Sequence, residues 1–153
     1  MRAVAHKGPF KGKGGDLAQW PDLFAAGRRA VAAALRDRRH RRDMVRAELK
    51  RLADQVRETY RDPPLRIVYA RAQGWIWRAR SARPETETLI ASLAQPRAVQ
   101  ILGQLPASAS RFLRAVERRR LDLNTEYLLL GHEIRHLEQW LERSRALGRR
   151  RTG

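Results

Sequence analysis

The chain contains no cysteine, so neither a disulfide nor a thiolate metal site holds its fold. It also has no uninterrupted apolar run near the length of about 18 residues that a membrane helix requires, and its N-terminus lacks the apolar stretch of a secretory signal. No glycine-rich phosphate loop, nucleophile elbow or convincing carboxylate pair is present. These absences predict a soluble cytoplasmic protein that is not an enzyme and has no membrane partner.

Acidic residues are few. The 153 residues include 16 Asp and Glu against 33 Lys and Arg, which gives a formal net charge of +17. The lysines are only Lys7, Lys11, Lys13 and Lys50, so nearly all of the cations are arginines. A guanidinium group bonds phosphate through two parallel hydrogen bonds and stacks on aromatic rings. This composition predicts binding to the backbone of RNA or DNA, in either strand state.

Size and pattern predict one all-α domain, a bundle of about five or six helices, because the apolar residues recur at helical spacing and strand-like alternation is not evident. Residues 1–15 mix glycine with lysine and are expected to form a flexible basic arm. Residues 16–148 are expected to form the helical domain, and 149–153 a basic tail.

Prolines divide the expected helices. A long helix is predicted over 22–60, with its apolar residues in one heptad phase that forms a seam along the helix. Arg38 and Arg42 occupy two positions of this seam. The helix therefore either leaves its core there and exposes a ring of basic residues, or it breaks near His40. A second helix is predicted over 65–81. Pro84, Pro96 and Pro106 then precede three short helical segments, and a final helix runs over 123–147 and ends at Gly148.

The first candidate site is a run of basic residues in the long helix. Its side chains cover every face of a helix, which a core does not tolerate, so the run is predicted to be exposed or bound to something acidic. Phosphate is the favoured ligand, with a solvated surface or a docking site for an acidic protein as alternatives. The proposed backbone contacts are Arg36, Arg38, Arg39, Arg41 and Arg42, joined by Lys7, Lys11 and Lys13 of the arm and by Arg118, Arg119 and Arg120.

The second candidate is Arg71, Trp75 and Arg78, which share one side of the expected second helix. An indole between two guanidinium groups is suited to stack on an unpaired base while the arginines neutralise phosphates. The alternative is that Trp75 completes the core, with arginine stems packed along it.

The third candidate is the sequence His132-Glu133-Ile134-Arg135-His136, which matches the HExxH pattern of zinc metallopeptidases. The match would make His132 and His136 zinc ligands and Glu133 the general base. The apolar stripe of this helix points about half a turn away from both histidines, and no clear third ligand follows. No metal and no cofactor are therefore expected.

The sequence as a whole favours a non-enzymatic protein that grips the nucleic-acid backbone as a small helical subunit of a nucleoprotein complex. Bundles of this size and charge occur among the small subunits of RNA-guided CRISPR effector complexes and among accessory proteins of plasmids and phages, although no family motif anchors either comparison. The alternatives are a zinc-dependent hydrolase at 132–136 and an interaction protein that docks on an acidic protein or on ribosomal RNA.

Overall fold

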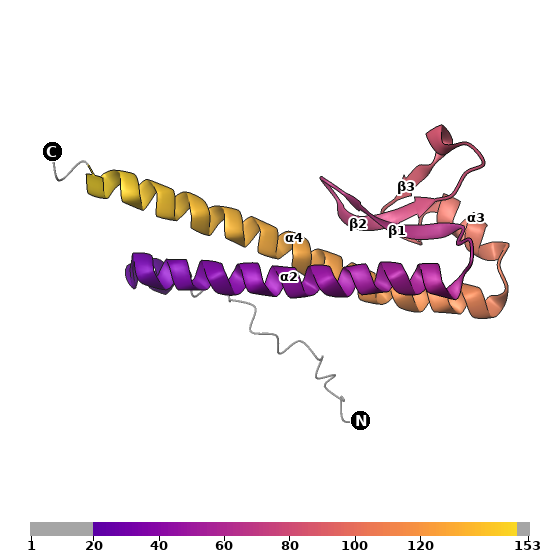
Figure 1. The fold of residues 1–153 in the computed structure, drawn as a ribbon, viewed down its shortest axis with the longest axis horizontal. Helices are drawn as coiled ribbons and strands as arrows, with labels where there is room; N and C mark the ends of the chain where they lie inside the picture. Colours follow the sequence, from indigo (N-terminus) through magenta and orange to yellow (C-terminus); the bar gives the residue numbers. More distant parts are fainter. Residues whose placement is uncertain (1–19, 150–153) are drawn as a thin grey trace, which may run out of the picture.

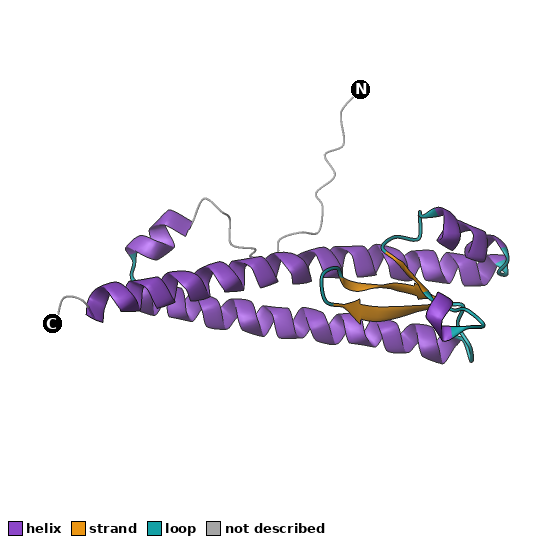
Figure 2. Ribbon diagram, turned by 90° about the horizontal axis from the view of Figure 1, so that it is seen from above, coloured by secondary structure: helices purple, strands orange, loops and turns teal. Residues whose placement is uncertain are grey.

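The computed structural model describes residues 20–149, which form a long antiparallel helical hairpin with a small sheet at one end (Figures 1 and 2). Helices α2 and α4 make the hairpin, and the sheet with α3 lies against the end where α2 stops and α4 begins. The elements are α1 (Trp20–Ala25), α2 (Arg28–Thr59), β1 (Leu65–Ala70), β2 (Gly74–Ala79), a 3₁₀ turn (Pro84–Thr86), β3 (Thr88–Ile90), α3 (Pro96–Gly103) and α4 (Ala107–Arg149).

The all-α prediction is wrong, because residues 65–81 form two strands and not a helix. β1 pairs with β2, and β2 with β3, in an antiparallel sheet of order β1-β2-β3. Leu65 and Ile67 face the same side as their partners Ala79 and Trp77, and all four are buried. Short apolar runs fit both helical and strand periods, and here the β-branched and aromatic residues prevail over helical spacing.

The structure has four α-helices within residues 20–149, fewer than the five or six expected. Of the three proline-led segments, only the one that begins at Pro96 is a separate short helix. The segment after Pro84 contains the 3₁₀ turn and β3, and the segment after Pro106 continues without interruption into the final helix. Helix α2 does not break near His40. The chain breaks instead at Gly27, whose φ of +91° suits a glycine.

The two long helices are joined along their length by apolar clusters, as the heptad pattern of α2 predicted. Away from the sheet, α1 packs on the cluster that contains Val31 and Leu35, and in the middle Val45 and Leu49 meet Leu123 of α4. The largest cluster lies under the sheet, and its members include Val56, Leu65, Trp77, Ile90, Leu102 and Leu113. The sheet therefore covers one side of the helical hairpin, and only at the end where α2 stops and α4 begins.

A buried polar network fixes the sheet to α4. Arg120, which is 0% exposed, donates to Glu117 and to the carbonyl oxygens of Trp75 and Ala91. Glu117 in turn accepts a hydrogen bond from Trp77 Nε1 at 2.6 Å. Because every partner belongs to β2, to the chain after β3 or to α4, the network holds these parts in register.

The tip of the β1–β2 hairpin is attached to α4 by Asn124. Its Oδ1 accepts a hydrogen bond from the Trp75 amide at 2.7 Å, and its Nδ2 donates to the Gln73 carbonyl at 3.0 Å. Gly74 has a φ of +73°, and a Cβ atom there would overlap Asn124 Oδ1. The tip is thus held over the groove between α2 and α4, midway along the helices (Figures 1 and 2).

Candidate nucleic-acid interface

Three arginines of the basic run in α2 form ion pairs with glutamates of α4. Arg38 pairs with Glu133, Arg39 with Glu138 and Arg41 with Glu126. The hydrogen bond to Glu126 raises the pKa of Arg41, although burial acts in the opposite direction. These three arginines of the run are therefore paired with acidic groups of the same chain.

The other arginines of the run differ from these three. Arg36 is exposed, and it has no carboxylate partner among the described residues. Arg42 is half-buried: its guanidinium carbon lies 4.6 Å from the centre of the Tyr127 ring, and its Nη2 donates to the Tyr127 hydroxyl at 3.3 Å. Its Nε is buried, with no hydrogen-bond partner among the described residues. A buried charged donor without a partner points to a missing acceptor.

Arg42 lines a cavity of about 410 Å³ that α2, α4 and the tip of the β1–β2 hairpin enclose together. Helix α4 contributes Tyr127, His132 and Arg135, and the strand and turn contribute Tyr69 and Arg71. Among residues 20–149, neither Asp nor Glu lines the cavity. We call it the cationic pocket. Three guanidinium groups around one hollow repel one another unless an anion lies between them, so the arrangement favours an anionic ligand.

Arg135 and His132 lie on one side of this pocket, one turn apart on α4. Arg135 Nη2 and His132 Nδ1 are 2.9 Å apart, which places the guanidinium and the ring side by side. Arg71 reaches the pocket from the exposed turn between β1 and β2. The basic groups therefore come from three separate elements that converge on one point.

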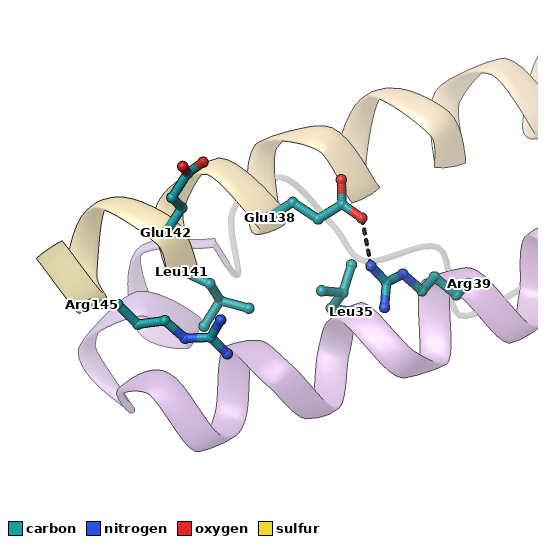
Figure 3. A pocket seen from close by; sticks show the side chains of 6 residues that line it. All are labelled: Leu35, Arg39, Glu138, Leu141, Glu142 and Arg145. Carbon is teal, nitrogen blue, oxygen red and sulfur yellow. Dashed lines mark hydrogen bonds and ion pairs between the residues drawn. The ribbon is translucent and has the colours of Figure 1, made fainter.

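Two other cavities of similar size have carboxylates among their lining residues. One, of about 300 Å³, lies between α2 and α4, and its lining includes Arg39, Arg145, Glu138 and Glu142 (Figure 3). The dashed line in Figure 3 is the ion pair of Arg39 with Glu138.

The second lies beside the start of β1 and has a volume of about 350 Å³. Four arginines and one carboxylate, Asp62, line it. Three of these arginines pair with acids: Arg57 with Asp54, Arg66 with Glu87 and Arg80 with Asp62, whereas Arg61 has no carboxylate partner among the described residues. Of these three cavities, the cationic pocket is the one without a carboxylate among the described residues that line it.

The group of Arg71, Trp75 and Arg78 does not assemble as predicted, because their segment is a hairpin. Arg71 lies in the turn, whereas Arg78 lies on β2 and is 3.5 Å from Glu87. Trp75 is half-buried and packs against two of the apolar clusters. Its ring centre is 5.8 Å from that of Tyr69, so it stands behind the pocket rather than in it.

The three consecutive arginines of α4 have three different surroundings. Arg118 is exposed and has no carboxylate partner among the described residues, Arg119 pairs with Glu48, and Arg120 is buried in the network under the sheet. Arg120 therefore belongs to the core of this fold and is not accessible to a phosphate. Lys7, Lys11 and Lys13 lie outside the described residues.

The HExxH residues serve other contacts. His132 lines the cationic pocket, Glu133 pairs with Arg38, and the His136 ring lies 6.2 Å from that of Trp20, edge to face. Within residues 20–149, no three His, Cys, Asp or Glu side chains are grouped so as to hold a metal ion.

Sequence reasoning missed Tyr69, Tyr127 and Arg135 as members of a site. Tyr69 and Tyr127 lie 58 positions apart in the sequence, in a strand and a helix, and their ring centres are 6.4 Å apart in the fold. No local spacing reveals such a meeting. Of the residues that line the pocket, the sequence had singled out Arg42, Arg71 and His132, but not their meeting in one place.

No protein-family model matches the chain, and no curated protein or solved structure shows significant similarity to it. None of the helices in the described part of the chain is long and apolar enough to cross a membrane.

Proposed function

We propose that this protein is a non-enzymatic nucleic-acid-binding protein that contacts backbone phosphates and works as a subunit of a nucleoprotein assembly. The observation that carries the proposal is the cationic pocket, where Arg42, Arg71 and Arg135 converge without a carboxylate. Guanidinium groups bind phosphate through paired hydrogen bonds, so a phosphate in the pocket would balance the three converging cations.

The basic surface continues from the pocket along α4. Arg114 and Arg118 are exposed on the same side of the helix as His132, because 18 residues make five turns. Neither arginine has a carboxylate partner among the described residues. Contacts to phosphates depend on the charge of the nucleic-acid strand and not on its base sequence. Binding should therefore depend little on base sequence.

A salt titration tests the proposal. Each neutralised phosphate releases counterions, so the logarithm of the affinity should fall linearly with the logarithm of the salt concentration, with a slope of about 0.9 per contact on duplex DNA and about 0.7 on single strands. Combining Arg71→Gln with Arg135→Gln should reduce the magnitude of this slope by the amount that about one to two phosphate contacts contribute. The matched control is Arg51→Gln, on the far side of α2, combined with Arg97→Gln on α3, which makes the same change in net charge.

The competing results are distinct. Affinity that does not change with salt, or no binding even at low salt, contradicts a backbone-binding function. Equal flattening by the pocket variant and the control variant would show that only net charge matters and that the pocket is not the site.

A further inference from the structure

We infer that the cationic pocket holds one nucleotide of a single strand, with its phosphate on the arginines and its base stacked on Tyr69. This inference rests on the proposed function and deepens it, since it names the strand state and the residue that selects it. It joins two observations, the absence of carboxylates from the pocket and an exposed aromatic ring at its edge.

Tyr69 is placed as a stacking surface. The residue lines the pocket and is 51% exposed, so part of its ring is open to a ligand. Trp75, its cross-strand partner in the register of β1 and β2, packs against it from the protein side, and Tyr127 meets it edge to face. A ring fixed on a strand by two other rings loses little conformational freedom when a base stacks on it.

The size of the pocket also suits a nucleotide. A volume of about 410 Å³ exceeds what a single phosphate fills and falls within the range of small-molecule sites, about 300 to 1,000 Å³. Stacking on Tyr69 requires a base whose face is free. Bases in a duplex are stacked on their neighbours, so only an unpaired nucleotide offers both its phosphate and its ring.

The surface beside the pocket fits the rest of the strand. One stripe of α4, at helical spacing of four and three, leads away from the pocket without an acidic residue: Arg114, Arg118, Leu121, Thr125, Leu128 and His132. Leu121 is 41% exposed, and an exposed leucine between cations offers an apolar contact to sugars and bases. From Arg118 to His132 the helix rises about 21 Å, which is room for several extended nucleotides.

The test compares strand states with a labelled oligonucleotide of mixed sequence, free and annealed to its complement, on the full chain. The wild-type protein should bind the single strand more tightly. Tyr69→Val, which keeps a residue suited to a strand, should weaken single-strand binding about tenfold and duplex binding less than twofold, since stacking is lost only with unpaired bases. Tyr69→Phe keeps the ring and should bind like the wild type.

Amide NMR with AMP, adenosine and inorganic phosphate then identifies the source of the ligand. AMP should shift the signals of Arg71, Ala72 and Gln73 at the hairpin tip more than phosphate or adenosine alone, and Arg135→Gln should reduce the effect severalfold. A circular dichroism melt of each variant checks that the fold is retained.

The outcomes separate the two proposals. Equal binding of both strand states, unchanged by Tyr69→Val, overturns this inference and leaves backbone binding intact. AMP binding without oligonucleotide binding overturns the proposed function and makes a free nucleotide the ligand. Binding of neither overturns both.

Discussion

Arg38 and Glu133 form an ion pair between α2 and α4, with the Arg38 Nε and Glu133 Oε2 atoms 2.5 Å apart. The residues are 95 positions apart in the sequence, and each side chain is only about a fifth exposed, at 22% and 21%. The pair explains two features at once. Glu133 neutralises Arg38, which lies at a position of the apolar seam of α2 that faces α4. The same contact directs Glu133, the glutamate of the HExxH sequence, to the interface between the two helices.

Replacing Glu133 by Gln should therefore lower the free energy of unfolding by about 1 kcal/mol, because a half-buried guanidinium loses its charged acceptor. Urea denaturation measures the change. Glu142→Gln on the same helix makes the same change in net charge, and Glu142 has no ion pair among the described residues, so it should cost less. Equal losses in the two variants would show that general charge repulsion, and not this pair, sets the stability.

Arg120→Met should destabilise the protein far more, by about 3 to 5 kcal/mol. The substitution leaves Glu117 as a buried charge without its partner and removes the donor to the carbonyl oxygens of Trp75 and Ala91. Arg118→Met, two positions away and exposed, is the control and should change stability by less than about 0.5 kcal/mol. The contrast is measured by urea denaturation, and similar costs for the two would mean that the network under the sheet contributes little.

The helical hairpin was predictable from sequence, and the sheet was not. The apolar seam predicted one face of α2, and its members are Val31, Leu35, Val45, Leu49, Leu52 and Val56. Leu52 is half-buried and the other five are buried. The residues of β1 and β2 also satisfy a helical spacing, and what decides for strands is their packing over the helices and the turn at Gly74. That packing depends on residues far away in the chain, so no local pattern contains it.

The residue type of the candidate site could be predicted, but its place could not. Arginine excess favoured a phosphate ligand, which stays a prediction, and two of the candidate arginines, Arg42 and Arg71, line one pocket. Other arginines of the same run are paired, because glutamates of α4 lie opposite them at matching heights. Which cations stay free depends on the register of the two long helices, and that register follows from the packed core.

Gly74→Ala should destabilise the hairpin tip, at a cost of about 2 to 4 kcal/mol. The backbone there has a φ of +73°, which disfavours a side chain, and the new methyl group would overlap Asn124 Oδ1. Thermal denaturation measures the loss, and the amide signals of Gln73 and Trp75 should shift as their bonds to Asn124 break.

The steric part of this cost can be separated. Adding Asn124→Ala to Gly74→Ala removes the overlap but not the backbone strain, so the double variant should lose less than the sum of the two single losses. Gly103→Ala, where a methyl group would meet nothing within 4 Å, should be nearly neutral. Strict additivity of the two single changes would show that Asn124 does not contact this turn.

Gly131→Ala should stabilise the protein by about 0.5 to 1 kcal/mol and raise the melting temperature by about 1 to 4 °C, because glycine in a helix interior is less favourable than alanine. Gly131 lies in the wall of the cationic pocket, and a methyl group there would sit 3.6 Å from Arg42 Nη2, in ordinary contact. Gly148→Ala, in the last turn of α4, should give a smaller gain, since helix ends fray.

Since Gly131→Ala leaves all three pocket arginines in place, the salt slope of nucleic-acid binding should equal that of the wild type. A lower melting temperature would show that Arg42 packs against Gly131 more closely than this, and a flatter slope would show that the arginine had moved.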